Sequence, residues 1–290
     1  MKKYIMIIAF VMIPSLLMAQ AAGGTIKRTI GKNTKSDGTI VKDKDRKGKT
    51  SKAEKYDWTA TSMTQAQKDQ VIQNLIKNFI YVEGGTFMMG DPSIKSQDKD
   101  KYVNQLLHEV SVQSFYIGKY EVTQEEWYAI MSDNPSEYKG DKRPVEQLGL
   151  KECEEFISRL NNITGRHFRL PTEEEWEYAA RGGKLTKHYE YAGSNNVNNV
   201  AWHRENSGSG VGHTHIVGKK NPNELGIYDM SGNVGELTQG VYMFRTTGSC
   251  AQVYRGGNYL YGPHHCNVYD RDPSSSGGSD KGLRLVMDVR

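Results

Sequence analysis

The most constraining feature of this sequence is the loss of periodic apolar spacing after residue 183. The last 107 residues contain Gly-Asn turns, Gly-Gly pairs and scattered aromatic residues, with only short stretches that resemble strands. Loops of this length are uncommon inside a compact domain unless they form a binding or catalytic surface or are held by ions. We therefore expect the functional surface of the chain to lie in its second half.

The regular elements are expected before that point. Thr64 and Gln67 form a capping box ahead of apolar residues at helical spacing, which predicts a helix over 65–78. Further elements are expected as strands over 79–89 (two strands around a Gly-Gly turn) and 110–120, and as helices after Thr123, over about 149–162 and after Thr172. Helices early in the chain and irregular β-structure later indicate an α+β domain.

The first residues have the pattern of a secretory signal peptide. Lys2 and Lys3 precede an apolar run over 5–18, and Ala-Gln-Ala at 19–21 supplies small residues for cleavage. The pattern predicts a signal peptide over 1–21 and an exported protein that is periplasmic, cell-surface or secreted. The run is shorter than the roughly 20 residues of a membrane span, so no transmembrane span is expected after cleavage. An uncleaved anchor is the alternative.

A basic linker is expected between the signal peptide and the domain, over 22–62, with the domain itself at 63–290. Residues 22–57 contain nine Lys and two Arg against five acidic residues, and few large apolar ones. Such a segment cannot bury enough surface to offset its ordering entropy, which favours a disordered tether. Because the positive charge is concentrated there, the net charge of +4 does not indicate nucleic-acid binding. Contact of the linker with a polyanion or an envelope surface is the alternative.

Several motifs, all in the same order, give the domain a family resemblance. They lie at 82–90, 120–127, 144–147, 169–183 (RLPTEEEWEYAARGG), 205–208, 222–234 (PNELGIYDMSGNV), 255–257 and 282–284. In these motifs the chain resembles the formylglycine-generating enzyme, or sulfatase-modifying factor, family over about 79–288. The resemblance implies a C-type-lectin-like α+β fold with low secondary-structure content and long calcium-stabilised loops.

The resemblance also locates an altered catalytic site. Family oxidases use oxygen, copper and two cysteines to convert a sulfatase cysteine to formylglycine. Cys266 matches the second of these cysteines, whereas Tyr261 stands at the position of the first. Cu(I) is soft and favours thiolates, while a phenol is a hard donor with a pKa near 10. The substitution implies loss of ordinary oxidase activity, and a copper- and oxygen-dependent oxidase that works through Cys266 with an altered site is the alternative.

Two kinds of metal site are considered. By resemblance, calcium is expected on the side chains of Asp229 and Glu236 and the carbonyls of Gly232 and Val234, four oxygens in one turn-rich loop. A hydrogen-bonded acidic loop is the alternative. His264 and His265 beside Cys266 offer ligands for copper or zinc. Adjacent residues of an extended segment point to opposite faces, however, so these three side chains are not expected to converge easily.

The segment 258–280 is dominated by Tyr, His, Asn, Asp, Ser and Gly, a composition that resembles an antibody paratope. It predicts a ligand-binding face, whose candidate residues are Asn258, Tyr259, Tyr261, His264, His265, Tyr269 and Asp270. The expected ligand is an exported protein, a peptide or a glycan. The alternatives are an ordinary solvated loop, and a structural subunit of an envelope or secretion apparatus.

The cysteine content leaves the redox state open. The chain has three cysteines, Cys153, Cys250 and Cys266. An odd number in an exported protein leaves at least one thiol without an intramolecular disulfide partner. A Cys250–Cys266 disulfide and a free Cys266 thiol are both compatible with the sequence.

Overall fold

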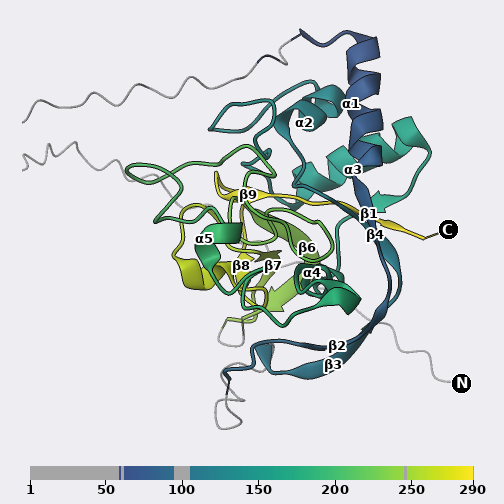
Figure 1. The fold of residues 1–290 in the computed structure, drawn as a ribbon. Coiled ribbons are helices and arrows are strands. Elements are labelled where there is room, and N and C mark those ends of the chain that lie inside the picture. The colour runs from purple at the N-terminus through teal and green to yellow at the C-terminus, as the bar shows by residue number, and fades with distance from the viewer. Residues whose placement is uncertain (1–58, 60–61, 95–104, 245–246, 290) are drawn as a thin grey trace, which may run out of the picture. The chain divides into compact units, whose positions relative to one another are not determined.

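A computed structural model describes residue 59 and the segments 62–94, 105–244 and 247–289, all within the compact unit Glu54–Arg290 (Figure 1). The signal peptide expected over 1–21, and all of the linker expected over 22–62 except residues 59 and 62, lie outside this part. Within it, no helix is long and apolar enough to cross a membrane.

The helices begin where the sequence supplies caps. Each of Thr64, Thr123 and Thr172 accepts a hydrogen bond from the backbone N–H three residues later, and the Gln or Glu side chain at that later position accepts one from the N–H of the threonine. Gly165 ends the longest helix in a left-handed conformation, with φ of 63°. The α-helices are α1 (Gln65–Lys77), α2 (Gln124–Met131), α3 (Leu150–Thr164), α4 (Glu173–Ala180) and α5 (Val197–Val200). The helices predicted from their caps are therefore all observed.

The strands form three small sheets, with orders β1-β4-β10-β5, β2-β3 and β8-β7-β6-β9. Most pairs are antiparallel, and β6 with β9 is parallel. Their bounds are β1 (Phe79–Val82), β2 (Gly85–Met89), β3 (His108–Val112), β4 (Phe115–Gly118), β5 (Phe168–Arg169), β6 (Gly235–Met243), β7 (Cys250–Arg255), β8 (Arg271–Ser274), β9 (Lys281–Gly282) and β10 (Val286–Asp288).

One predicted strand is wrong in its extent. The stretch expected as a single strand over 110–120 is two strands, β3 and β4, separated by Gln113 and Ser114. The hydroxyl of Ser114 accepts a hydrogen bond from the N–H of Gly84 (3.0 Å) at the equivalent break between β1 and β2. A Cβ on Gly84 would lie 2.4 Å from the backbone carbonyl oxygen of Val112. The β1–β2 and β3–β4 segments therefore approach closely at this point, where each passes from one sheet to the other.

The core has two main parts. In the first, α1, α2 and α3 pack together (Figure 1), with Trp127 stacked on Phe156 at 4.9 Å between ring centroids. In the second, α4 buries Trp176 and Tyr178 against residues of β1, β3, β4 and the loop after residue 225. The mixed helix-and-sheet architecture and the low content of regular structure confirm the expected α+β class. Between α4 and β6 the chain consists mainly of turns, as the loss of periodicity predicted.

Candidate functional site: the loop after β7 and its buried charges

A buried arginine fixes the loop that follows β7. Arg255, at the end of β7, is 1% exposed and forms an ion pair with Glu177 of α4. Its guanidinium also donates to the carbonyl oxygens of Tyr269 (3.2 Å) and Asp270 (2.9 Å). Because a buried cation needs several partners, these bonds hold the returning chain against the end of the strand.

The chain reverses sharply directly after that arginine. Gly257 has φ of 68°, and a Cβ on it would lie 2.4 Å from the carbonyl oxygen of His265. Asn258 then holds the turn, because its Oδ1 accepts from the N–H groups of Leu260 (3.0 Å) and Tyr261 (3.1 Å). The glycine and the asparagine together bring residue 265 back over the Arg-Gly-Gly motif.

Two of the seven candidate ligand residues lie inside the protein. Asn258 and Tyr259 are both 0% exposed. The amide of Asn258 donates to Asp280 (2.9 Å), and the hydroxyl of Tyr259 donates to Ser279 (3.0 Å). Their polar atoms therefore hold the loop from within and do not face solvent. Composition alone did not reveal this, because the residue type does not show whether its polar atoms form hydrogen bonds inside the protein or are exposed to a ligand.

The other candidates include a connected group whose members are exposed or partly buried. Tyr261 is 38% exposed and its ring centroid lies 5.1 Å from that of His265, which lies 4.1 Å from that of His264. Nδ1 of His265 is 3.1 Å from Oδ2 of Asp270, and burial raises the pKa of that carboxyl. The structure thus brings Tyr261, His264, His265 and Asp270 together, and we call these four residues the Tyr261 surface.

Two further residues border this surface. Tyr269 is partly buried, and its hydroxyl accepts from the amide of Asn267 (3.0 Å). Arg204 comes from a different loop, and its N–H donates to the carbonyl oxygen of Tyr261 (3.0 Å). The sequence analysis did not find Arg204, because it lies 57 residues before Tyr261 and no local motif connects the two.

Cys266 is not part of the Tyr261 surface. It ends a short 3₁₀ helix, Pro263–Cys266, is 0% exposed, and packs with Tyr191, Val200 and Ala201. Burial raises the pKa of its thiol to about 12, so the thiol is protonated at neutral pH. All three cysteines are free in the structure, with Cys250 exposed, so the Cys250–Cys266 disulfide is not formed here.

A cluster of buried carboxylates surrounds Arg284 beside the start of β6. Glu236, at the start of β6, accepts from the Arg284 guanidinium and from the Trp176 indole (2.6 Å). Glu121 accepts from the N–H of Val234 (3.1 Å), and burial, followed by repulsion from neighbouring carboxylates, raises the pKa of its carboxyl well above the usual value. Asp229 is the third carboxylate of this cluster, and the charge of Arg284 partly offsets the rise in the pKa of both Glu121 and Asp229.

Asp229 is the member of this cluster with spare capacity. Its Oδ2 accepts from the N–H of Gly218 (2.6 Å), whereas its Oδ1 is buried and has no hydrogen-bond partner in the described structure. Burial raises the pKa of Asp229 to about 6. An acceptor without a partner beside other acidic groups fits a bound cation.

The other side chain of the calcium set implied by resemblance, Glu236, is engaged by other groups in this arrangement. Both oxygens of Glu236 already accept from Arg284, and one also accepts from Trp176. A carboxylate has about four lone-pair positions, so little capacity is left for an ion. Gly232 and Val234 lie in the same loop, with the N–H of Gly232 donating to the Gly256 carbonyl (2.7 Å). Among the described residues, no group of three or more His, Cys, Asp or Glu side chains is placed to hold a metal, so His264, His265 and Cys266 do not form one.

The fold and this site define an α+β domain with few regular elements, whose long loops are held by buried ion pairs. The sulfatase-modifying factor enzyme 1-like domain model matches residues 62–289. The chain therefore belongs to the sulfatase-modifying factor family, and the resemblance seen in its motifs is confirmed.

Relatives of this family differ in what their names say of activity. Chaperone protein LppX of Paenibacillus barcinonensis is 32% identical over 259 residues, which cover 72% of this chain and 89% of the relative. The formylglycine-generating enzyme of Mycobacterium tuberculosis is 31% identical, but the match covers only 41% of this chain and 51% of that enzyme. The inactive C-alpha-formylglycine-generating enzyme 2 of Bos taurus is 26% identical, covering 63% of this chain and 76% of the relative.

Solved structures confirm the fold of the formylglycine-generating enzymes. Treponema denticola variable protein 1 is 27% identical with a TM-score of 0.63, covering 73% of this chain and 95% of that protein. Pseudomonas aeruginosa PvdO is 22% identical with a TM-score of 0.58, covering 73% of this chain and 94% of PvdO, and this likeness concerns the fold alone.

Proposed function

We propose that this chain is a non-catalytic member of its family that binds a protein or peptide ligand outside the cytoplasm. The observation that supports this best is the separation of Cys266 from solvent. A soft metal needs thiolates, and the Cys266 thiol is fully buried with its pKa raised to about 12. The matching position of the first family cysteine carries Tyr261, whose ring is at the surface.

Two relatives support a binding role. One is named a chaperone and is matched over 89% of its length, and another is named an inactive enzyme. Both names describe those proteins, and by analogy we propose that this chain recognises a polypeptide without converting it. The extracytoplasmic setting is proposed from the signal-peptide pattern over 1–21.

The Tyr261 surface is the proposed contact area. It combines an exposed phenol ring, two imidazoles and a carboxylate, with Arg204 at its border. Rings of this kind supply large contact areas at low entropic cost, while small polar groups adapt their hydrogen bonds to the ligand. Because Asn258 and Tyr259 hold the loop from within, the surface is organised before a ligand arrives, which favours affinity.

A direct assay tests the absence of catalysis. The purified domain is incubated with a peptide containing Cys-x-Pro-x-Arg, copper and a reductant, alongside a formylglycine-generating enzyme as positive control. We expect no formylglycine from the wild type. We also expect none from Tyr261→Cys, because the neighbouring thiol stays buried. Conversion by the wild type that is abolished by Cys266→Ser would overturn the proposal and establish the altered-site oxidase.

A second experiment tests the binding surface. Peptide and glycan arrays are probed with the wild type, with Tyr261→Ala, and with Tyr81→Ala, a control at another exposed tyrosine on β1. We expect the Tyr261 variant to lose about tenfold or more in affinity for the selected peptides, as aromatic interface residues commonly do. Equal binding by the two variants would place the contact elsewhere.

We also propose that a calcium ion binds beside Asp229. The free Oδ1 atom and the surplus of carboxylates in this region support it. In this proposal Asp229 and backbone carbonyls of the loop that contains Gly232 and Val234 provide the oxygens, while Glu236 stays with Arg284.

A further inference from the structure

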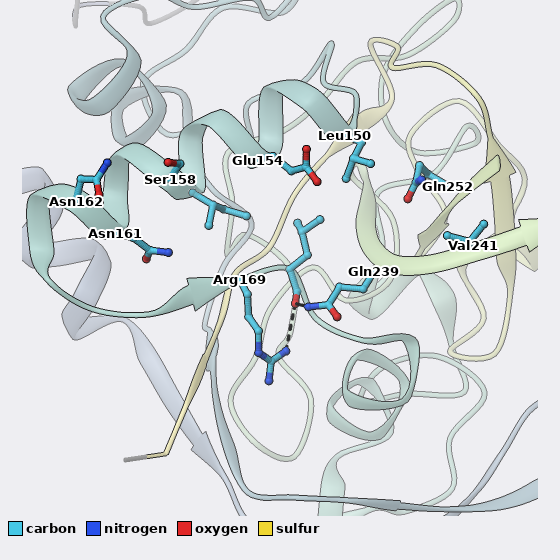
Figure 2. Close-up of a pocket in the computed structure, with 11 residues that line it drawn as sticks. Leu150, Glu154, Ser158, Asn161, Asn162, Arg169, Gln239, Val241 and Gln252 are labelled. Atoms are coloured by element: carbon cyan, nitrogen blue, oxygen red, sulfur yellow. Dashed lines mark hydrogen bonds between the residues drawn. The ribbon is translucent and has the colours of Figure 1, made fainter. Parts of the chain in front are cut away.

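A groove formed by residues outside the Tyr261 surface has features of a peptide site. It has a volume of about 600 Å³ and lies between α3 and the strands β6 and β7 (Figure 2). None of its lining residues belongs to the loop after β7 or to the carboxylate cluster of Glu121, Asp229 and Glu236.

One wall of the groove is a continuous face of α3. Its lining residues are Leu150, Glu154, Ile157, Ser158 and Asn161, which recur at the spacing of a single helix face. Figure 2 shows Glu154, Ser158 and Asn161 on the side of α3 that faces Arg169 and Gln239. A rise of 1.5 Å per residue makes this face about 16 Å long, enough for about five residues of an extended chain.

The opposite wall comes from the end of β5 and from β6 and β7. Leu170, Gln239, Val241 and Gln252 line it. Gln239 is fixed by a hydrogen bond from its Nε2 to the Leu170 carbonyl (2.8 Å), and Val241 is 55% exposed, so an aliphatic side chain is available for contact. The groove therefore has aliphatic surface on both walls and amide groups between.

The charges of the groove disfavour an anionic ligand. The cation in its lining, Arg169, already donates to both oxygens of Glu175 (2.7 Å each) and to Asp288 (2.6 Å). Glu154, in contrast, has a side chain with no hydrogen bond or ion pair to any described residue. An available carboxylate without an available cation favours a positively charged group in the ligand.

The residue types of the lining also disfavour nucleobases. The described residues that form it include no aromatic ring. Nucleobases commonly bind by stacking on aromatic side chains. The side chains of Ser158, Asn162 and Gln252 make no hydrogen bond to any described residue, so they are available to pair with the N–H and C=O groups of a polypeptide.

We propose that this groove binds an extended polypeptide segment in which aliphatic residues are flanked by lysine or arginine. The aliphatic side chains contact Ile157 and Val241, the cationic side chain pairs with Glu154, and the amides of Asn162 and Gln252 pair with the peptide backbone. This site is separate from the Tyr261 surface, and it stands or falls independently of that surface and of the proposed absence of catalysis.

The test uses three fluorescein-labelled hexapeptides that share a central Leu-Val pair and carry Lys, Gln or Glu on both flanks. Fluorescence anisotropy with the full mature chain measures their affinities. We expect the order Lys, then Gln, then Glu. In Glu154→Lys we expect binding of the Lys peptide to weaken about tenfold and the order to reverse, because a charge-assisted contact becomes a repulsion.

The matched control is Glu155→Lys, which makes the same charge change on the same helix at a residue outside the groove lining. It should leave the order of the peptides unchanged. Equal effects of the two variants, or no saturable binding of the Lys peptide by the wild type, would overturn the proposal.

Hydrogen exchange locates the bound peptide independently of the variants. We expect the Lys peptide to slow exchange of amides in 150–162, 239–241 and 250–252 and to leave 258–270 unchanged. Protection of 258–270 without protection of α3 would assign the peptide to the Tyr261 surface and overturn the groove proposal.

Discussion

Arg284 and Glu236 form a buried ion pair in which Nε of the arginine lies 2.9 Å from each carboxylate oxygen, and both residues are 0% exposed. The same guanidinium donates to the carbonyl oxygens of Gly118 (2.8 Å), at the end of β4, and Tyr228 (2.8 Å), in the loop before β6. One side chain therefore joins two sheets and the loop that carries Asp229. Because its partners lie far apart in the sequence, this pair holds the loop region to the scaffold.

The first prediction concerns the loss of this arginine. Arg284→Met leaves the buried carboxyl group of Glu236 without its partner, and removes the donors to two backbone carbonyls. Breaking a buried pair from one side costs about 3–5 kcal/mol, and we expect a loss of that size in the free energy of unfolding, measured by urea denaturation.

The double variant Arg284→Met/Glu236→Gln provides the control. It removes the uncompensated charge, so it should recover part of the loss. Recovery should be incomplete, because Glu121 and Asp229 remain beside the site. A loss below about 1 kcal/mol in the single variant would show that water or another cation replaces the guanidinium.

The fold was predictable where short-range signals decide it. The capping boxes at Thr64, Thr123 and Thr172 gave the starts of three helices, because the pairing of a cap with the third helical residue is local. The break between β3 and β4 was missed, since it depends on Gly84 crossing the chain at Ser114 from 30 residues away. Strand pairing was likewise not predictable from the sequence, because most of the strands are too short to show which strand each one pairs with.

The candidate site was predictable in composition but not in geometry. The motifs led to the family and to the loop that contains Tyr261 and Cys266. They did not show that Asn258 and Tyr259 are interior, nor that Glu236 is engaged by an arginine 48 residues later. Burial and ion pairs of this kind depend on how distant parts of the chain pack together, and they cannot be predicted from a single sequence.

The second prediction concerns the thiols. Cys250 is exposed, whereas Cys153 and Cys266 are buried, and burial raises the pKa of both buried thiols. The thiolate is the reacting form, so we expect Ellman's reagent to modify Cys250 alone in the native protein and all three thiols in guanidinium chloride. Cys250→Ser should then have no rapidly reacting thiol. Two rapid thiols would show that Cys153 or Cys266 is accessible, and none would indicate a disulfide that includes Cys250.

The third prediction concerns pH. Glu146 is 0% exposed, its Oε2 has no hydrogen-bond partner in the described structure, and burial raises the pKa of its carboxyl to about 7. The folded state therefore holds this proton more tightly than the unfolded state. The contribution of Glu146 to stability is present in full below about pH 4.5 and is lost as pH rises through about 7.

Glu146→Gln tests this directly, since glutamine resembles the protonated acid. At pH 8 we expect the variant to be more stable than the wild type by about 1–3 kcal/mol, and at pH 4.5 we expect the two to differ little. Denaturant unfolding at several pH values measures the difference. Glu109→Gln, at an exposed position on β3, is the control and should not change the pH dependence in this way. A Glu146→Gln variant that is less stable at pH 8 would mean that the carboxylate is ionised and stabilised in the folded protein.

The last prediction concerns calcium. Burial raises the pKa of Asp229, so without a metal its ionised form opposes folding at neutral pH, and a bound cation would remove that penalty. We expect calcium at about 100 times its dissociation constant to stabilise the protein by about 2.7 kcal/mol relative to EGTA, seen as a higher melting temperature. Asp229→Asn should melt higher than the wild type in EGTA and respond less to calcium, because the repelling charge and the ligand are lost together.

Glu174→Gln, an acidic residue outside the cluster, should respond like the wild type. Glu236→Gln decides between the two possible ligand sets. If the arginine occupies that carboxylate, the calcium response survives in the variant, whereas its loss would show that Glu236 exchanges Arg284 for the ion. Identical melting in calcium and EGTA, with no calcium in the purified protein, would leave Asp229 as a destabilising buried acid and remove calcium from the account of these loops.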